Sequence, residues 1–190
     1  TDANYSPWSF INDQGELDGF DVDVAKEVAA RLGVDVEFVT PDWEAVTSGG
    51  WDAQWDVSIG SMTPTDERAE VLWFTDPYYY NSRVFGLHKD NTTITTLDDL
   101  ASKRVGGQTG FPTEFYFMGI LDMGDYGGVI CYPPPEGVTA VYYMLDQYAL
   151  LDLALGDGFR LDAALVSQVY LALEPDFLAF DLKYMGPAAF

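Results

Sequence analysis

The chain has 190 residues, of which 48% are hydrophobic, so it is long enough to bury a core as one large domain or two small ones. It carries 31 acidic residues and only nine basic ones, and the formal net charge of -22 argues against nucleic acid or anionic lipid as a partner, since both require a basic face. The single cysteine, Cys131, excludes an internal disulfide, and together with the single histidine, His88, it argues against a zinc or iron–sulfur site. We therefore expect no metal and no cofactor.

Helices and strands are expected to alternate along the first half of the chain, as in an α/β sheet. An apolar stripe at helical spacing predicts a helix from residue 19 to Gly33, where the glycine ends it. The stripe consists of Val24, Val28 and Leu32. Short apolar or alternating stretches predict strands at residues 34–38, 56–59 and 83–87.

Residues 60–68 form the most informative stretch of the chain. Thr63 is a suitable N-cap, and Pro64 fits the first helical position, where its missing N–H does no harm. The free backbone N–H groups and the dipole at this helix start favour an anion, and Arg68 adds a planar guanidinium that matches a carboxylate. The stretch therefore predicts a carboxylate site. The alternative is that Arg68 only pairs with neighbouring acids on a solvated helix face.

The same alternation begins again after a polar stretch at residues 88–93. Two α/β units joined by such a stretch predict two lobes, and small ligands usually bind in the cleft between lobes. The expected elements of the second unit are a short helix capped by Thr96, a strand at 104–108, a helix from Pro112, a strand at 129–131, one broken helix at 138–155, a strand at 161–166 and a final helix capped by Ser167.

Several segments, taken in order, carry a family resemblance. They are residues 2–10, residues 15–23, Trp43, residues 60–68, residues 74–79 and residues 161–165. Together they resemble the bacterial extracellular solute-binding proteins of amino-acid ABC transporters, in the class that binds polar amino acids. The resemblance implies a type II periplasmic-binding fold, an α/β fold whose two lobes close over a ligand held in the cleft between them.

The resemblance also implies how the chain divides into lobes. Lobe 1 is expected to comprise residues 1–88 and 184–190, and lobe 2 residues 89–183. Members of the family normally return to the first lobe after a stretch like residues 181–190 and complete that lobe with another strand and two helices. We therefore expect that the C-terminal part of lobe 1 is missing from this chain or is supplied otherwise.

Ligand contacts implied by the resemblance come from both lobes. Asp2 lies at the first ligand-facing strand end, and Tyr5 and Trp43 match two rings that cover the ligand side chain. The other lobe 1 positions are Gly60, Ser61 and Thr63, which offer carbonyl and hydroxyl contacts to an α-ammonium and a carboxylate, and Arg68, which binds the carboxylate. The lobe 2 positions are Gln108, Phe111 and Pro112 on a strand-to-helix loop, and Ser167 at a position that is usually acidic.

Two departures from the family pattern concern the ligand. Residues 110–112 read Gly-Phe-Pro where the family usually has Gly-Thr-Thr, so a hydroxyl contact to the carboxylate is lost. Ser167 stands where an aspartate normally holds the α-ammonium, and a buried ammonium without a carboxylate partner is costly. Either Asp2 supplies this charge, or the ligand lacks a conventional α-amino group.

These features predict the binding component of an ABC transporter, which captures an amino acid or a related small carboxylate and presents it to a membrane permease. We expect a monomer in the periplasm or outside the cell, with any signal peptide already removed or never present, and without chemistry of its own. One alternative is an enzyme like the cyclic amino-acid dehydratases, for which Glu114 and Glu136 are the candidate acids. The other is a ligand-sensing receptor domain.

Overall fold

The computed structural model describes residues 1–110, 112–121, 133–173 and 182–187, and it divides the chain into two compact units, Thr1–Thr75 and Asp76–Phe190. None of the helices in these described ranges is long and apolar enough to cross a membrane. The lobe limits expected at residues 88 and 184 stay a prediction.

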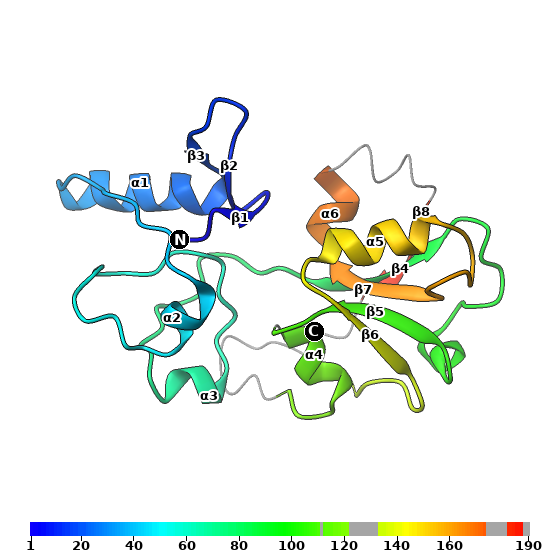
Figure 1. Cartoon of the computed structure of the whole chain (residues 1–190). Helices are drawn as coiled ribbons and strands as arrows, with labels where there is room; N and C mark the ends of the chain where they lie inside the picture. The colour runs from blue at the N-terminus through cyan, green and yellow to red at the C-terminus, as the bar shows by residue number, and fades with distance from the viewer. Residues whose placement is uncertain (111, 122–132, 174–181, 188–190) are drawn as a thin grey trace. The chain divides into compact units, whose positions relative to one another are not determined.

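The first unit consists of a three-stranded antiparallel sheet, in the order β1-β2-β3, and three helices (Figure 1). The rings of Tyr5 and Trp8 stack at its centre, with centroids 4.6 Å apart and planes inclined by 21°. The elements are β1 (Asn4–Tyr5), β2 (Ser9–Ile11), β3 (Leu17–Asp18), α1 (Phe20–Leu32), α2 (Trp43–Thr47) and α3 (Asp66–Ala69).

Helix α1 confirms the expected helix and its end at Gly33. That glycine has a φ of 70°, in the left-handed region, and its N–H bonds back to the carbonyls of Ala29 and Ala30. The predicted stripe is wrong, because Val28 and Leu32 are exposed. Helical periodicity allowed more than one packed face, and small side chains decided between them by letting α1 approach β2 and β3 closely. The buried face consists of Asp21, Val22, Ala25 and Ala29.

The strands predicted at residues 34–38 and 56–59 are not present. Both stretches lack ladder partners, since β1, β2 and β3 form the only sheet within residues 1–75. Val34, Val36 and Val57 are exposed. Alternation of residue types is consistent with a strand, but a strand also requires a neighbour to accept and donate its hydrogen bonds.

The start of α3 also differs from the expectation. Thr65, not Thr63, is the N-cap: its backbone is extended, and its hydroxyl accepts a hydrogen bond of 3.3 Å from the N–H of Arg68. Pro64 lies before the helix instead of at its first position. A proline disfavours the helical conformation of the residue before it, which moves the cap to the threonine that follows.

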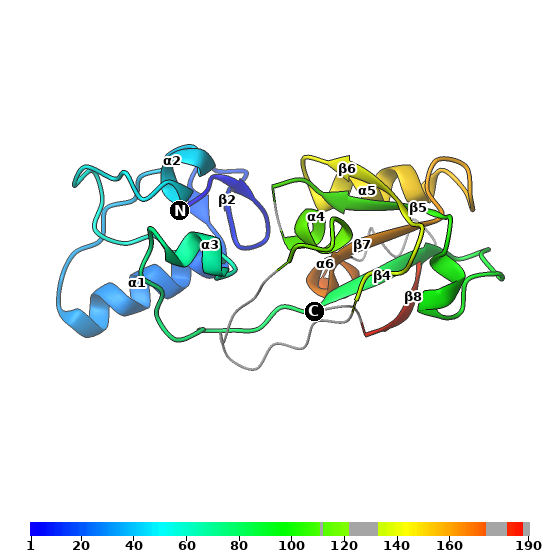
Figure 2. The same ribbon diagram turned by 90° about the horizontal axis from the view of Figure 1, so that it is seen from below.

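The second unit is built on a five-stranded mixed sheet in the order β6-β5-β7-β4-β8 (Figure 2). Strand β5 runs parallel to β6 and β7, whereas β4 is antiparallel to β7 and β8. The elements are β4 (Arg83–His88), the 3₁₀ helix η1 (Leu97–Leu100), β5 (Arg104–Gln108), α4 (Pro112–Phe117), β6 (Thr139–Tyr143), α5 (Asp146–Ala154), β7 (Ala163–Ser167), α6 (Gln168–Leu173) and β8 (Leu182–Pro187).

Several expectations for the second unit are confirmed. Strands β4, β5 and β7 lie where they were predicted, within one or two residues, and α4 begins at Pro112. Thr96 caps η1 in a capping box with Asp99, and the hydroxyl of Ser167 accepts a hydrogen bond of 3.2 Å from the N–H of Val169 at the start of α6. The strand predicted at residues 129–131 lies outside the described residues.

The broken helix predicted at residues 138–155 is wrong. Its first part is strand β6 and its second part is helix α5, with Leu145 as the N-cap between them. Val141, Tyr142 and Tyr143 are β-branched or aromatic residues that fit a pleated surface, and pairing with β5 commits them to the sheet.

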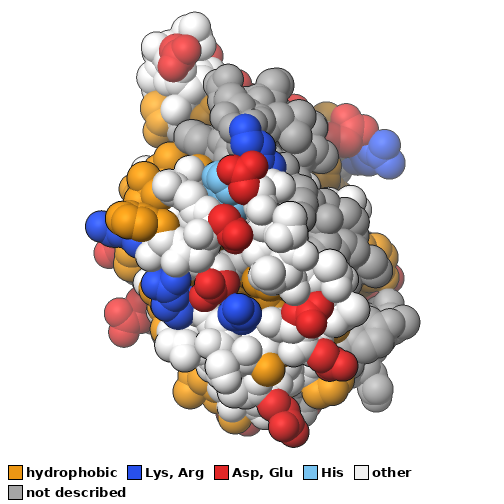
Figure 3. Space-filling model, turned by 90° about the vertical axis from the view of Figure 1, so that its right-hand side faces the viewer, with side chains coloured by type: hydrophobic (Ala, Val, Ile, Leu, Met, Phe, Trp, Pro, Cys, Tyr) orange, Lys and Arg blue, Asp and Glu red, His pale blue; other side chains and the backbone are white. Residues whose placement is uncertain are grey.

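Helices cover both faces of β5, as two consecutive glycines show. A Cβ atom on Gly106 would lie 3.0 Å from the Cβ of Ala149 in α5, and one on Gly107 would lie 2.6 Å from Cγ2 of Thr113 in α4. Successive residues of a strand point to opposite faces, so α4 and α5 pack on opposite sides of the sheet (Figure 1). On the face that Figure 3 shows, acidic side chains are interspersed with Lys and Arg.

Replacement of Gly107 tests this close packing. We expect Gly107→Ala to destabilise the protein by about 1–3 kcal/mol, because the new methyl group overlaps Thr113 and the ring of Phe117. Gly86→Ala in β4 is the matched control, since a Cβ there meets its nearest heavy atoms at 3.8 Å, an ordinary contact distance. Urea unfolding measures both variants. Equal midpoints for the two would contradict the packing of α4 on β5.

Candidate functional site

Arg68 is the centre of the candidate site in the first unit. It is only 8% exposed; its Nη1 donates to the carbonyl of Thr63 at 2.8 Å, and its Cζ lies 5.3 Å from the ring centroid of Trp43. Asp66 and Glu70, its expected partners in the alternative interpretation, are both exposed. Since Arg68 is buried, a mere ion pair on a solvated helix face does not describe it.

The guanidinium of Arg68 is a positive charge largely shielded from solvent. Burial lowers the pKa of the guanidinium from its ordinary value, and the nearby carboxylate of Glu67 opposes this shift by raising it. A guanidinium still remains protonated in proteins. Electrostatic attraction is stronger away from water, so a planar cation held by Trp43 and Thr63 is suited to bind a carboxylate through two parallel hydrogen bonds.

The segment before Arg68 is held by a residue that was not among the predicted contacts. The hydroxyl of Ser61 donates to both carboxylate oxygens of Asp21, at 2.9 and 2.8 Å, and Asp21 has no exposed surface. Gly60 and Thr63 are half-buried on either side. The position of Asp21 near the start of α1 could have pointed to it in the sequence. Its role could be inferred only once the buried face of that helix was known.

The remaining predicted residues of the first unit lie in two places. Tyr5 is buried against Trp8, and Asp2 uses Oδ1 to accept the N–H of Asn4 at 2.7 Å. Trp43 lies at the start of α2, over the guanidinium of Arg68. The structure thus brings Trp43, Thr63 and Arg68 together, and a ligand side chain held between the rings of Tyr5 and Trp43 stays a prediction.

Gln108 and Pro112 lie at the end of β5 and the start of α4, and both are buried. Nε2 of Gln108 donates to the carbonyl of Met144 at 3.1 Å, while its buried Oε1 has no hydrogen-bond partner among the residues that the structure describes. Oε2 of Glu114 accepts from the N–H of Gly110 at 2.6 Å and from the hydroxyl of Thr109 at 2.8 Å. The carboxylate of Glu114 thus bonds to the two residues that follow β5. Phe111 lies outside the described residues.

Ser167, at the end of β7, is fully buried in a polar network. Its hydroxyl donates to Oδ1 of Asn81 at 2.9 Å, and its N–H donates to Oδ2 of Asp146 at 3.1 Å. Nη1 of Arg83 donates to the same oxygen of Asp146, so a buried ion pair lies beside Ser167. Neither Arg83 nor Asp146 was predicted as a site residue. Asp146 was hidden because the sequence placed it in the middle of one long helix, whereas it is the first residue of α5.

Comparisons with known proteins agree over nearly the whole chain. Residues 1–175 match the family described as "Bacterial extracellular solute-binding proteins, family 3". A probable amino-acid ABC transporter-binding protein of Haemophilus influenzae is 34% identical over 104 residues, which are 55% of this chain and 40% of that protein. The histidine-binding periplasmic protein of Escherichia coli strain K12 is 30% identical over 192 residues, which cover 99% of this chain and 67% of that protein.

A solved structure supports the same conclusion about the fold. An ancestral arginine-binding protein bound to arginine matches with a TM-score of 0.75 and 30% identity, over 99% of this chain and 77% of that chain. This match confirms the predicted α/β class and the type II periplasmic-binding fold. The chain spans 40% and 67% of the lengths of the two curated relatives.

Proposed function

The chain belongs to the bacterial extracellular solute-binding proteins of family 3, and on this premise we propose that it binds an amino acid or a related small carboxylate for an ABC transporter. It captures the solute in the periplasm or outside the cell as a monomer, and it delivers the solute to a membrane permease. The relatives named above are binding proteins rather than enzymes, which supports capture without chemical change.

The observation that carries this proposal is the environment of Arg68. A buried guanidinium that lies over the ring of Trp43 and is bonded to a carbonyl is restricted in orientation, so little conformational entropy is lost when a carboxylate binds. Every amino acid presents such a carboxylate. The strongly acidic composition of the chain further favours solutes that also carry a positive group.

A calorimetric screen of the standard L-amino acids tests the proposal. We expect binding of at least one of them in the micromolar range or tighter, and L-arginine and L-histidine are the first to try, because relatives are named for them. The bound compound should be recovered unchanged. Recovery of a product that has lost water would instead favour the dehydratase alternative, with Glu114 or Glu136 as the acid. No binding of any amino acid or related carboxylate would refute the proposal.

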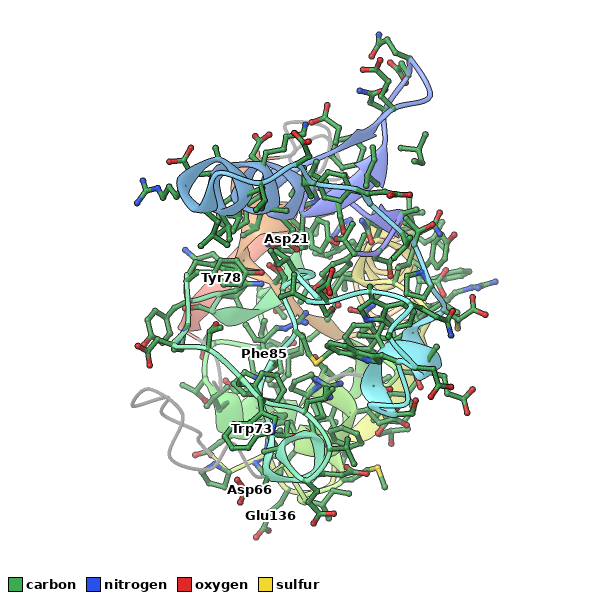
Figure 4. The ribbon with its side chains drawn as sticks, turned by 90° about the vertical axis from the view of Figure 1, so that its left-hand side faces the viewer. Asp21, Asp66, Trp73, Tyr78, Phe85 and Glu136 are labelled. Carbon is green, nitrogen blue, oxygen red and sulfur yellow. The ribbon has the colours of Figure 1, made fainter. Side chains whose placement is uncertain are left out.

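The fluorescence of Trp43 links binding to the site. If the ligand lies beside Trp43, its addition should change the tryptophan emission, and Trp43→Phe should remove that change. Trp73→Phe is the control, because the Trp73 side chain is fully exposed in the first unit (Figure 4).

Whether the ligand carries an α-amino group can be tested directly. The amino acid that binds best is compared with its analogue lacking the α-amine, L-arginine with 5-guanidinopentanoate for example. Equal affinities would favour a ligand without a conventional α-amino group, whereas clear preference for the amino acid would mean that an acidic group such as Asp2 supplies the missing charge.

A further inference from the structure

Asp21 is a buried acid that links separate parts of the candidate site. Its backbone N–H donates to the carbonyl of Trp8 at 2.8 Å, and Trp8 stacks on Tyr5. Its carboxylate accepts hydrogen bonds from the hydroxyl of Ser61, 40 residues further along the chain. Figure 4 shows Asp21 at the beginning of α1. A carboxylate with no exposed surface is tolerated only when polar groups surround it, so these contacts hold both segments in place.

Ser61 has a backbone conformation that needs support. Its φ is 53°, in the left-handed region that residues other than glycine rarely adopt. Thr63 follows two residues later, and its carbonyl accepts a hydrogen bond from Nη1 of Arg68. A hydrogen bond from Ser61 to helix α1 therefore acts on the carbonyl of Thr63, two residues beyond, and through it on the orientation of the Arg68 guanidinium.

We propose that Asp21 is a positioning residue for carboxylate binding: it holds Ser61 in the left-handed conformation and thereby fixes the carbonyl of Thr63 that orients Arg68. Asp21 does not touch the ligand itself. The proposal rests on the proposed function, because it assigns to the Asp21–Ser61 contact the orientation of the carboxylate-binding group.

The first test needs no ligand. In the wild type we expect a resolved, slowly exchanging guanidinium signal from Arg68 in ¹⁵N NMR spectra, since Nη1 is bonded and the side chain is buried. Asp21→Leu has a side chain of similar size but no acceptor, and should broaden or remove this signal. Asp21→Asn keeps one acceptor oxygen for Ser61 and should retain it. Asp23→Leu, at an exposed acid of the same helix, is the control.

The second test measures recognition of the carboxylate. L-arginine is compared with agmatine, which is arginine without its carboxylate. Asp21→Leu and Ser61→Ala should each lower the preference for L-arginine at least tenfold, and the double variant should be no worse than either single variant, because both remove the same contact. Asp21→Asn should lose no more than about threefold, since it keeps one hydrogen bond of the same kind.

The two tests separate the possible failures. If the wild type binds no amino acid, the proposed function fails, and the NMR comparison still decides the role of Asp21. If Asp21→Leu leaves the Arg68 signal unchanged, the positioning role is wrong even where binding is intact. Should Asp21→Leu not fold, Ser61→Ala answers the same question. Equal losses of affinity for L-arginine and agmatine would indicate a purely structural role.

Discussion

Arg68→Ala should abolish measurable amino-acid binding while the protein stays folded. Truncating one partner of a buried charge-assisted pair typically costs about 2–5 kcal/mol, which corresponds to a loss of affinity of roughly thirtyfold or more. The helix that carries Arg68 keeps its cap, because Thr65 bonds to the backbone of residue 68 and not to its side chain. Isothermal titration calorimetry with the tightest-binding amino acid measures the loss.

Two variants show whether the shape of the guanidinium matters. Arg68→Lys keeps the charge but loses the planar, two-pronged donor that lies over the ring of Trp43, so an intermediate loss of affinity is expected. Arg31→Ala removes an arginine that is 79% exposed on α1, and it should bind like the wild type. A loss of less than tenfold for Arg68→Ala would mean that the carboxylate is bound elsewhere.

The second large effect concerns the buried pair of Arg83 and Asp146. These residues are 6% and 1% exposed, and the pair joins the start of β4 to the start of α5. Removal of one partner leaves an uncompensated charge in the interior, so Arg83→Met and Asp146→Leu should each lower the free energy of unfolding by about 3–5 kcal/mol. Urea unfolding of each variant, followed by circular dichroism, measures this change.

The double variant distinguishes charge from packing. Arg83→Met combined with Asp146→Leu buries no charge, so it should be more stable than either single variant, with a coupling free energy that a double-mutant cycle gives directly. The pair of Arg31 and Glu27, whose side chains are 79% and 62% exposed, is the matched control and should contribute at most about 1 kcal/mol. Additive effects of Arg83→Met and Asp146→Leu would show that the ion pair itself does not stabilise the fold.

Local signals in the sequence predicted several boundaries correctly. Gly33 ends α1, Thr96 caps η1, Pro112 begins α4 and Ser167 caps α6. Each of these depends on the conformation or hydrogen bonding of one residue and its near neighbours, which the residue type largely determines. The stretch around Arg68 was recognised for the same reason, although its cap is Thr65.

The errors share a different cause. Residues 34–38 and 56–59 have the composition of strands but no partner strand in the described part of the chain, and residues 139–143 form a strand because β5 lies beside them. In α1 two apolar stripes were compatible with the helical period, and contact with β2 and β3 chose between them. Strand pairing and helix orientation depend on which other elements pack beside a segment, and the local sequence does not specify these neighbours.

For the candidate site, the sequence by itself determined the family and singled out Arg68 as the candidate carboxylate-binding residue. The tertiary structure decided which groups surround Arg68 and the other buried charges. Asp21 reaches Ser61 and Asp146 reaches Arg83 across 40 and 63 residues. These carboxylates need such partners because packing removes them from water, and a buried charge is costly without one. Which residue becomes the partner depends on the fold and not on the local sequence.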